Sequence, residues 1–231
     1  MSSHPVIAEA CEEINRRLAG KQQGQLYRAR VVTDAETEAV GHVCAQAFLE
    51  DPIFKHVLGE EQPEQRLRQL DFVFATFYWT WSDTSVVIET VEAPRRVVAG
   101  VVLNLPDGET RYLRQLAFVK ILWHLGITNS FRMARFFGAV DALTGPAWAK
   151  VAPPRDRVLM DAVFVDPGCQ GQGLGKTLIQ GTLEAVNRRW TMIFYTESEK
   201  NEAFYHRCGC ETLEQVTVED VPLWIMSRPK Q

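Results

Sequence analysis

The chain has 231 residues, of which 46% are hydrophobic and 23% charged, and its formal net charge is -4. This length suits one main domain with a sizeable core, and the balanced composition excludes general disorder. The negative charge provides no general attraction to nucleic acid or to an anionic membrane, so we expect neither as a partner.

Five cysteines form an odd set in a chain large enough to fold without disulfides, which indicates a reducing compartment. Cys208 and Cys210 are separated by one residue and lie far from a second Cys or His pair, so we expect no metal site. The charged N-terminus lacks the apolar run of an export signal, and the apolar stretch over residues 112–127 is too interrupted to span a membrane. We therefore expect a cytoplasmic protein.

The predicted elements begin with a helical extension over residues 1–24, in which apolar side chains recur at helical spacing. A strand over residues 26–32 follows. Thr33 and Glu36 then form a possible capping box for a helix that ends before Pro52, because the residue preceding a proline is disfavoured in a helix. Residues 63–81 predict a further helix, whose stripe of aromatic side chains either packs in the core or lines a pocket.

Residues 25–231, which follow the helical extension, are expected to form one domain around one sheet. Short β-branched runs predict a hairpin over residues 85–103, and a helical insert is expected from about residue 110 to 152. The remaining predictions are strands over 158–165 and 192–196, helices over 174–189 and 201–208, and two final strands over 212–218 and 223–227.

A glycine-rich turn follows the strand over residues 158–165 and precedes the next predicted helix. Its sequence, Gln-Gly-Gln-Gly-Leu-Gly, covers residues 170–175. Glycines let a ligand approach the backbone closely, and the unpaired N–H groups at a helix start favour an anion. The turn therefore predicts a site for a phosphate-bearing cofactor.

Spacing distinguishes three phosphate-binding motifs that could explain this turn. A nucleotide-triphosphate loop would need a glycine where Gln170 stands, five positions before Gly175. A dinucleotide fingerprint that starts at Gly171 would need its third glycine where Lys176 stands. The third pattern is Gln or Arg, two residues, Gly, one residue, then Gly or Ala, and it is met at Gln170, Gly173 and Gly175.

This third pattern resembles the acetyl-CoA signature of the GNAT superfamily, and a second motif supports the resemblance. Tyr205 stands four residues before Gly209, as in the superfamily's second motif, with one predicted helix and one predicted strand between the two motifs. Cys210 departs from the aromatic residue that usually follows this glycine. Over about residues 27–230 the chain is similar to puromycin N-acetyltransferase and related small-molecule acetyltransferases.

The resemblance implies an α/β fold with a central mixed, mostly antiparallel twisted sheet flanked by helices, and with the helical insert between the third and fourth strands. It implies acetyl-CoA as cosubstrate, no metal, and a monomer or homodimer. The backbone after residue 162 would bind the pantetheine arm and the acetyl carbonyl, and the turn would hold the diphosphate. The expected cofactor-binding residues are Val163, Phe164, Val165, Gln170, Gly171, Gln172, Gly173, Leu174, Gly175, Lys176 and Asn201.

Some of these roles have alternatives in the sequence. Asn201 either binds the pantetheine or simply caps its helix. Tyr205 is the expected general acid for the departing thiolate, because a phenol with a pKa of about 10 keeps its proton at neutral pH. Asp161 is the expected general base, with Glu197 as the competitor. Strand alternation places Asp161 and Val163 on one face unless a bulge intervenes.

The implied function is transfer of an acetyl group from acetyl-CoA to a primary amine of a small molecule, by direct attack of the amine on the thioester. One alternative within the same fold is acetylation of a protein N-terminus or lysine. Another is a non-catalytic sensor that binds acyl-CoA. Nucleotide hydrolysis is a third, and it rests on Gly175, Lys176 and Thr177 alone.

Overall fold

The computed structural model describes residues 4–59, 62–106 and 118–230, which form a seven-stranded sheet with the order β1-β2-β3-β4-β5-β7-β6. Strands β4 and β5 pair in parallel, and the other neighbours in the sheet pair antiparallel. This confirms the mixed, mostly antiparallel sheet that the sequence predicts. The strands are β1 (Tyr27–Val31), β2 (Ser85–Thr90), β3 (Val97–Asn104), β4 (Arg157–Val165), β5 (Thr191–Thr196), β6 (Glu211–Val218) and β7 (Val221–Arg228).

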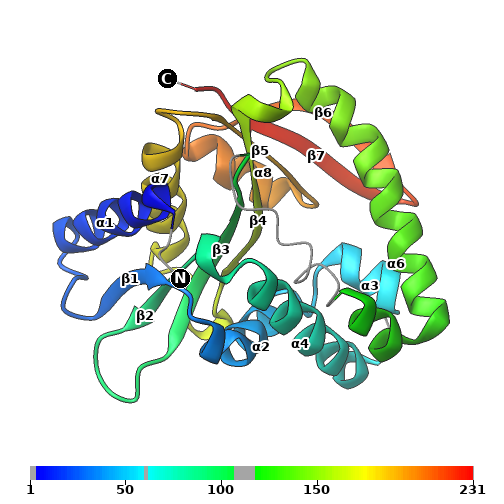
Figure 1. The fold of residues 1–231 in the computed structure, drawn as a ribbon, viewed down its shortest axis with the longest axis horizontal. Coiled ribbons are helices and arrows are strands. Elements are labelled where there is room, and N and C mark those ends of the chain that lie inside the picture. The colour runs from blue at the N-terminus through cyan, green and yellow to red at the C-terminus, as the bar shows by residue number, and fades with distance from the viewer. Residues whose placement is uncertain (1–3, 60–61, 107–117, 231) are drawn as a thin grey trace.

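Helices cover both faces of the sheet (Figure 1). Helices α1 and α7 pack together on one face, whereas α2 and α4 pack on the other. The described helices are α1 (Pro5–Gly20), α2 (Thr37–Ala47), α3 (Pro52–Leu58), α4 (Pro63–Thr80), α6 (Phe118–Ala149), α7 (Leu174–Val186) and α8 (Glu199–Arg207). None of them is long and apolar enough to cross a membrane.

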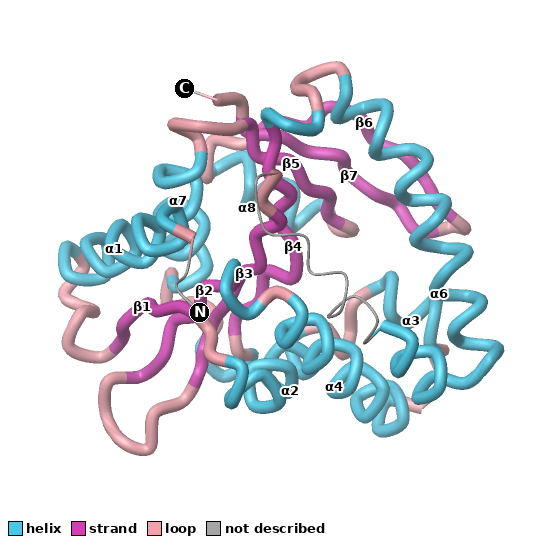
Figure 2. Tube along the Cα trace, in the orientation of Figure 1, coloured by secondary structure: helices cyan, strands magenta, loops and turns pink. Residues whose placement is uncertain are grey.

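Helix α6 is the predicted insert between the third and fourth strands. It follows β3 in the chain and runs beside β6 and β7 before the chain enters β4 (Figure 2). Gly126, at φ 74°, interrupts its helical backbone. The insert is confirmed over the described residues, and its predicted start at about residue 110 lies outside them.

Helix α1, predicted as an extension, is built into the main core. Its apolar residues belong to the same buried cluster as residues of β3, β4 and α7. Asn15 also pairs with the outer strand β1, since its side chain donates to the Ala29 carbonyl at 3.0 Å and accepts from the Ala29 N–H at 2.7 Å. The helix therefore covers both the sheet face and part of the edge strand.

Helix α3 was missed by the sequence analysis, which used Pro52 only to end the preceding helix. Pro52 is instead the first residue of a new helix, where its missing N–H and fixed φ are favourable. Asp51 caps this helix by accepting from the N–H groups of Ile53 at 2.9 Å and Phe54 at 3.3 Å. The pair Asp51-Pro52 is the local sequence pattern that indicates the start of this helix.

The aromatic stripe of α4 packs in the core, which decides between the two readings of the sequence. Phe74 and Tyr78 are buried, and the rings of Phe48, Phe54 and Phe74 contact one another with centroids 5.1–5.8 Å apart. A surface hollow of about 710 Å³ does adjoin α4, on a side that includes Phe72 and Trp79. No candidate site residue lines that hollow.

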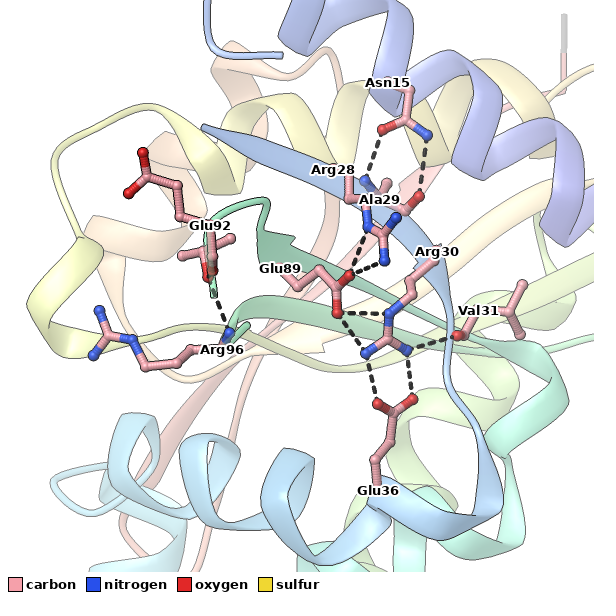
Figure 3. A network of polar contacts seen from close by, with 10 residues as sticks. Asn15, Arg28, Ala29, Arg30, Val31, Glu36, Glu89, Glu92 and Arg96 are labelled. Atoms are coloured by element: carbon pink, nitrogen blue, oxygen red, sulfur yellow. Dashed lines mark hydrogen bonds and ion pairs between the residues drawn. The ribbon is translucent and has the colours of Figure 1, made fainter. Parts of the chain in front are cut away.

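A network of charged side chains joins β1 to β2 and to the turn before α2 (Figure 3). Glu89 is only 3% exposed, and its carboxylate accepts from Arg28 at 2.6 Å and from Arg30 at 2.7 Å. Arg30 also donates to Glu36 at 2.6 Å. Glu36 in turn accepts from the Thr33 N–H at 2.7 Å, as expected for a capping box.

Candidate active site

Strands β4 and β5 separate in the middle of the sheet. Their parallel pairing ends at Leu159 and Ile193. Beyond that point β4 continues to Val165 along β3, while β5 continues to Thr196 along β7. In the described part of the chain, the facing edges of the two strands therefore have no strand partner past this pair. Of the β4 residues there, Ala162 bonds instead to side chains, since its carbonyl accepts from the Tyr78 hydroxyl at 3.1 Å and its N–H donates to Asp161 at 2.8 Å.

A β-bulge lies in β4 directly after this separation. Gly100 pairs with Phe164 and Val102 with Asp161, so Val101 alone faces both Ala162 and Val163. Ala162 has the unusual positive φ of 44°. A bulge shifts the alternation of side chains by one residue.

The bulge decides which faces Asp161 and Val163 occupy. Val163 packs in the core cluster under α1 and α7, whereas Ala162 packs with α2 and α4. Asp161 lies near Cys44 and Tyr78, two residues of the α2 and α4 side whose pKa values are raised by burial, and its charge raises both pKa values further. Asp161 and Val163 therefore lie on different faces, because the bulge that the sequence analysis named as the exception to strand alternation stands between them.

The glycine turn runs from the end of β4 to the start of α7. Gly171 and Gly173 both have φ 78°, a conformation that favours glycine. No described group accepts a hydrogen bond from the backbone N–H groups of residues 170–176. A side-chain Cβ would meet nothing within 4 Å at Gly171, so ligand atoms can approach the backbone there. These free donors at the N-terminus of a helix suit the phosphates of a coenzyme.

Gly175 lies where β4, α7 and α8 meet. A Cβ at this position would lie 3.2 Å from Cγ2 of Val165 and 3.7 Å from Cζ of Phe204. The end of β4 and the turn, both expected to hold the cofactor, are thus neighbours, and α8 packs beside them. The residues present therefore fit a phosphate-bearing coenzyme such as acetyl-CoA, because the turn has free N–H donors and the strand edge beside it has no strand partner.

Asn201 lies in the first turn of α8 and is not its cap. Ser198 is the cap residue, and its hydroxyl accepts from the Asn201 N–H at 3.3 Å. The Asn201 side chain donates to Glu197 at 3.1 Å. The reading of Asn201 as a simple helix cap is therefore wrong, and its role toward the cofactor stays a prediction.

Tyr205 projects from α8 into the core on the α1 and α7 side. It is 8% exposed, and its ring centroid lies 4.5 Å from that of Phe194 and 5.2 Å from that of Phe204. Burial raises the pKa of the phenol, and the nearby negative charge of Glu197 raises it further. The hydroxyl therefore stays protonated at neutral pH and can donate a proton.

Carboxyl groups that are buried or half-buried gather where β4 and β5 separate. Burial raises the pKa of Asp161, and the charge of Asp141 adds to this, although the Ala162 N–H bonds to the carboxylate at 2.8 Å. Burial also raises the pKa of both Asp51 and Glu197, whose side chains share a hydrogen bond. Two carboxyl groups can share one only if a proton lies between them. The sequence analysis did not foresee this pair.

Tyr195 shows that these acidic groups surround one region. The pKa of its phenol is raised by burial first, and then by the charges of Asp161, Glu197, Asp51 and Asp141. The four carboxyl groups come from different elements, namely β4, the end of β5, the start of α3, and α6. In the described ranges, no group of three or more His, Cys, Asp or Glu side chains could hold a metal ion.

Comparison with known proteins supports this assignment of the fold. Residues 134–211, which include β4, the glycine turn, α7, β5 and α8, match the family described as acetyltransferase (GNAT) domain. A structure from Corynebacterium glutamicum, described as histone acetyltransferase HPA2 and related acetyltransferase, is similar to this chain at 15% identity and a TM-score of 0.62. The match covers 89% of this chain and 97% of that one.

Two further structures are similar over most of their length. A polyamine N-acetyltransferase of Drosophila melanogaster that forms N-acetylagmatine matches at 16% identity and a TM-score of 0.57, covering 87% of this chain and 97% of that one. The yncA structure from Salmonella typhimurium, solved with its cofactor acetyl-CoA, matches at 15% identity and a TM-score of 0.50, covering 89% and 95%.

The family match therefore covers residues 134–211 as a GNAT acetyltransferase domain, and the solved structures show that the chain shares the fold of N-acetyltransferases. Together the two findings indicate an acetyl-CoA-dependent N-acetyltransferase, as the resemblance in the sequence implies. The finer likeness to puromycin N-acetyltransferase, the cytoplasmic location and the oligomeric state stay predictions.

Proposed function

We propose that this chain transfers an acetyl group from acetyl-CoA to a primary amine of a small molecule. The observation that carries the proposal is the free glycine turn beside the separated ends of β4 and β5. The coenzyme supplies an activated thioester when bound. The residues of the chain hold it, keep a proton available for the departing thiolate, and remove one from the amine.

The holding residues follow from the fold. The backbone N–H and C=O groups at the unpaired edge of β4, around Val163, Phe164 and Val165, form hydrogen bonds with an elongated ligand, as they would with a neighbouring strand. The free N–H groups of residues 170–176 donate to phosphate oxygens, and Lys176 adds charge at the same turn.

The proton-transferring residues lie on opposite faces of the sheet. Tyr205 is on the α1 and α7 side, where its protonated phenol serves as general acid. Asp161 is on the α2 and α4 side, where its carboxylate serves as general base for the amine. The separation of β4 and β5 lies between the two faces, so a reaction there could use both groups.

The acidic groups also favour one kind of acceptor. Burial raises the pKa of Tyr195 most, and the charges of the surrounding carboxyl groups raise it further. Even with one proton shared between Asp51 and Glu197, the group of four carboxyls carries negative charge, so this region attracts positive charge. An amine is mostly a cation at neutral pH, so the negative carboxyl groups attract it to this region until it loses its proton. A cationic amine is therefore the kind of acceptor that this region favours. The polyamine acetyltransferase among the structural neighbours supports this choice.

Release of free thiol from acetyl-CoA, measured while the protein is mixed with a panel of amines, tests the proposal. We expect release with small cationic amines. Changing Tyr205 to Phe should lower kcat by about 100-fold, because a positioned acid contributes on this scale. CoA affinity should change less than about twofold, because the lost hydroxyl acts on the departing thiolate.

Three results would contradict parts of this account. If acetyl-CoA does not raise the melting temperature of the wild-type protein while ATP does, the cofactor assignment is wrong. Binding of acetyl-CoA without thiol release over a broad panel would favour the sensor. Unchanged kcat in the Tyr205→Phe variant would remove Tyr205 from the mechanism and leave the cofactor site standing.

A further inference from the structure

The segment that joins α1 to β1 lies directly against the glycine turn. Lys21 donates from its ammonium to Oγ1 of Thr177 at 2.7 Å, in the first turn of α7. Gln23 donates to the Gln172 carbonyl at 3.0 Å, and the Tyr27 hydroxyl donates to the Gln172 side chain at 2.8 Å. This segment therefore contacts both the turn and the helix that follows it.

The ammonium of Lys21 lies at the turn without a partner of opposite charge. A Cβ built on Gly173 would be 3.8 Å from this nitrogen. Of the groups that the structure describes, its hydrogen-bond partner is the neutral hydroxyl of Thr177, and no carboxylate lies within ion-pair distance. Lys21 thus adds a full positive charge beside the free backbone N–H donors of the turn.

This placement is electrostatically unfavourable unless an anion binds there. The N-terminus of a helix carries partial positive charge from its free N–H groups, and a cation beside it is repelled. The N–H groups of residues 170–176 have no described acceptor either. A bound anion would interact favourably with the helix terminus and with the ammonium at once.

The position of Lys21 is held by the packing of α1 on α7. At Gly181 of α7 a Cβ would lie 2.9 Å from the Ile14 backbone nitrogen, so the two helices approach closely. Arg17 pairs with Glu184 at 2.6 Å, and Arg189 pairs with Glu9 at 2.7 Å. The Lys21 N–H itself bonds back to the carbonyls of Arg17 and Leu18. The backbone that carries the ammonium is therefore fixed relative to the turn.

We propose that Lys21 binds a phosphate group of the coenzyme, and that the N-terminal segment is thereby part of the cofactor site. The proposal rests on the function proposed above, because it assigns a residue to that same site. It gives α1 and the joint after it a direct part in binding. The group recognised is either the diphosphate or the 3′-phosphate, which share the same chemistry.

Binding of three ligands, measured by titration calorimetry, tests the proposal. The ligands are CoA, dephospho-CoA, which lacks only the 3′-phosphate, and pantetheine, which lacks all phosphates. Changing Lys21 to Met should weaken CoA binding by about tenfold, as expected for loss of one charge-assisted contact. Pantetheine binding should be unchanged. The Lys21→Arg variant should recover most of the CoA affinity, and a Lys150→Met control, at an exposed lysine beside β6, should not differ from wild type.

Dephospho-CoA separates the two phosphate sources. An equal loss for CoA and dephospho-CoA in the Lys21→Met variant assigns the lysine to the diphosphate. A loss for CoA alone assigns it to the 3′-phosphate. Raising the salt concentration should reduce the difference between wild type and variant, because the lost interaction is between charges.

Two outcomes would overturn the proposal, and they differ from failure of the proposed function. If Lys21→Met binds CoA as tightly as wild type, Lys21 does not contact phosphate. If the Lys21→Met variant loses affinity for CoA and for pantetheine equally, Lys21 only supports the fold. The same conclusion follows if the ligand-free variant has a melting temperature so much lower than wild type that the loss of stability explains the weaker binding. If the wild-type protein binds none of the three ligands, the cofactor assignment itself fails.

Discussion

At the scale of single residues, the choice of general base depends on two half-buried carboxyl groups. Asp161 lies at the bulge of β4, and Glu197 follows β5 and shares a hydrogen bond with Asp51. Burial raises the pKa of both. A base must be unprotonated to act, so a raised pKa moves the acid side of the activity profile to higher pH than an ordinary carboxyl group would.

Changing Asp161 to Asn should lower kcat/KM by about 100-fold and remove the rise of activity with pH that its titration produces. Changing Glu197 to Gln should leave that rise in place, because Glu197 shares a proton with Asp51 and is not the group that accepts the proton of the amine. Glu197 is the matched control because it is the other candidate base. The measurement is kcat/KM against pH for the two variants and the wild type. If the rise disappears in Glu197→Gln and persists in Asp161→Asn, the roles are reversed.

At the scale of elements, the contact between α1 and α7 decides where the N-terminal segment meets the turn. Gly181 allows the close approach, since a Cβ there would lie 2.5 Å from Cγ1 of Ile14 and 3.0 Å from its Cα. Two of the nearest atoms belong to the backbone of α1, so a larger residue would require the whole helix to shift.

Changing Gly181 to Ala should lower the free energy of unfolding by about 1–3 kcal/mol, because the steric cost exceeds the gain of about 1 kcal/mol in helix propensity. Gly138, in α6, is the matched control, because a Cβ there meets nothing within 4 Å. Its change to Ala should raise the free energy of unfolding by about 0.5–1 kcal/mol. Urea unfolding measures both. Equal effects of the two changes would mean that α1 is not packed closely on α7.

At the scale of the whole molecule, the outer strands β1 and β2 are held to the sheet partly by buried charge. Burial alone would raise the pKa of Glu89, but the hydrogen bonds from Arg30 and Arg28 outweigh it and the pKa is lowered. A carboxyl group whose pKa is lower in the folded state stabilises the fold at pH values above its unfolded pKa. That contribution is lost as the pH falls through the folded pKa.

Changing Glu89 to Gln should therefore lower the free energy of unfolding by about 1–3 kcal/mol at neutral pH, and the difference from wild type should shrink in the acid range below about pH 4. Glu214, in an exposed pair with Lys150, is the control, and its change to Gln should have an effect below about 0.5 kcal/mol. Unfolding curves at several pH values provide the comparison. A loss that is constant with pH would show that Glu89 acts by packing and not by charge.

The sequence alone determined the features that depend on neighbouring residues. The spacing of Gly171, Gly173 and Gly175, and the position of Tyr205 before Gly209, are local patterns that report backbone conformation and helix geometry directly. The order of strands and helices was also readable, because alternation and helical spacing act over a few residues. Helix α3 was readable in the same way from Asp51 and Pro52, although it was missed.

Only the tertiary structure decided which distant residues meet. The bulge at Ala162 places Asp161 and Val163 on different faces, and it arises from pairing with β3, not from the sequence of β4 alone. The carboxyl pair of Asp51 and Glu197 joins the start of α3 to the end of β5. Lys21 reaches the glycine turn because α1 packs on α7. Such contacts depend on how separate elements pack, which no local spacing encodes.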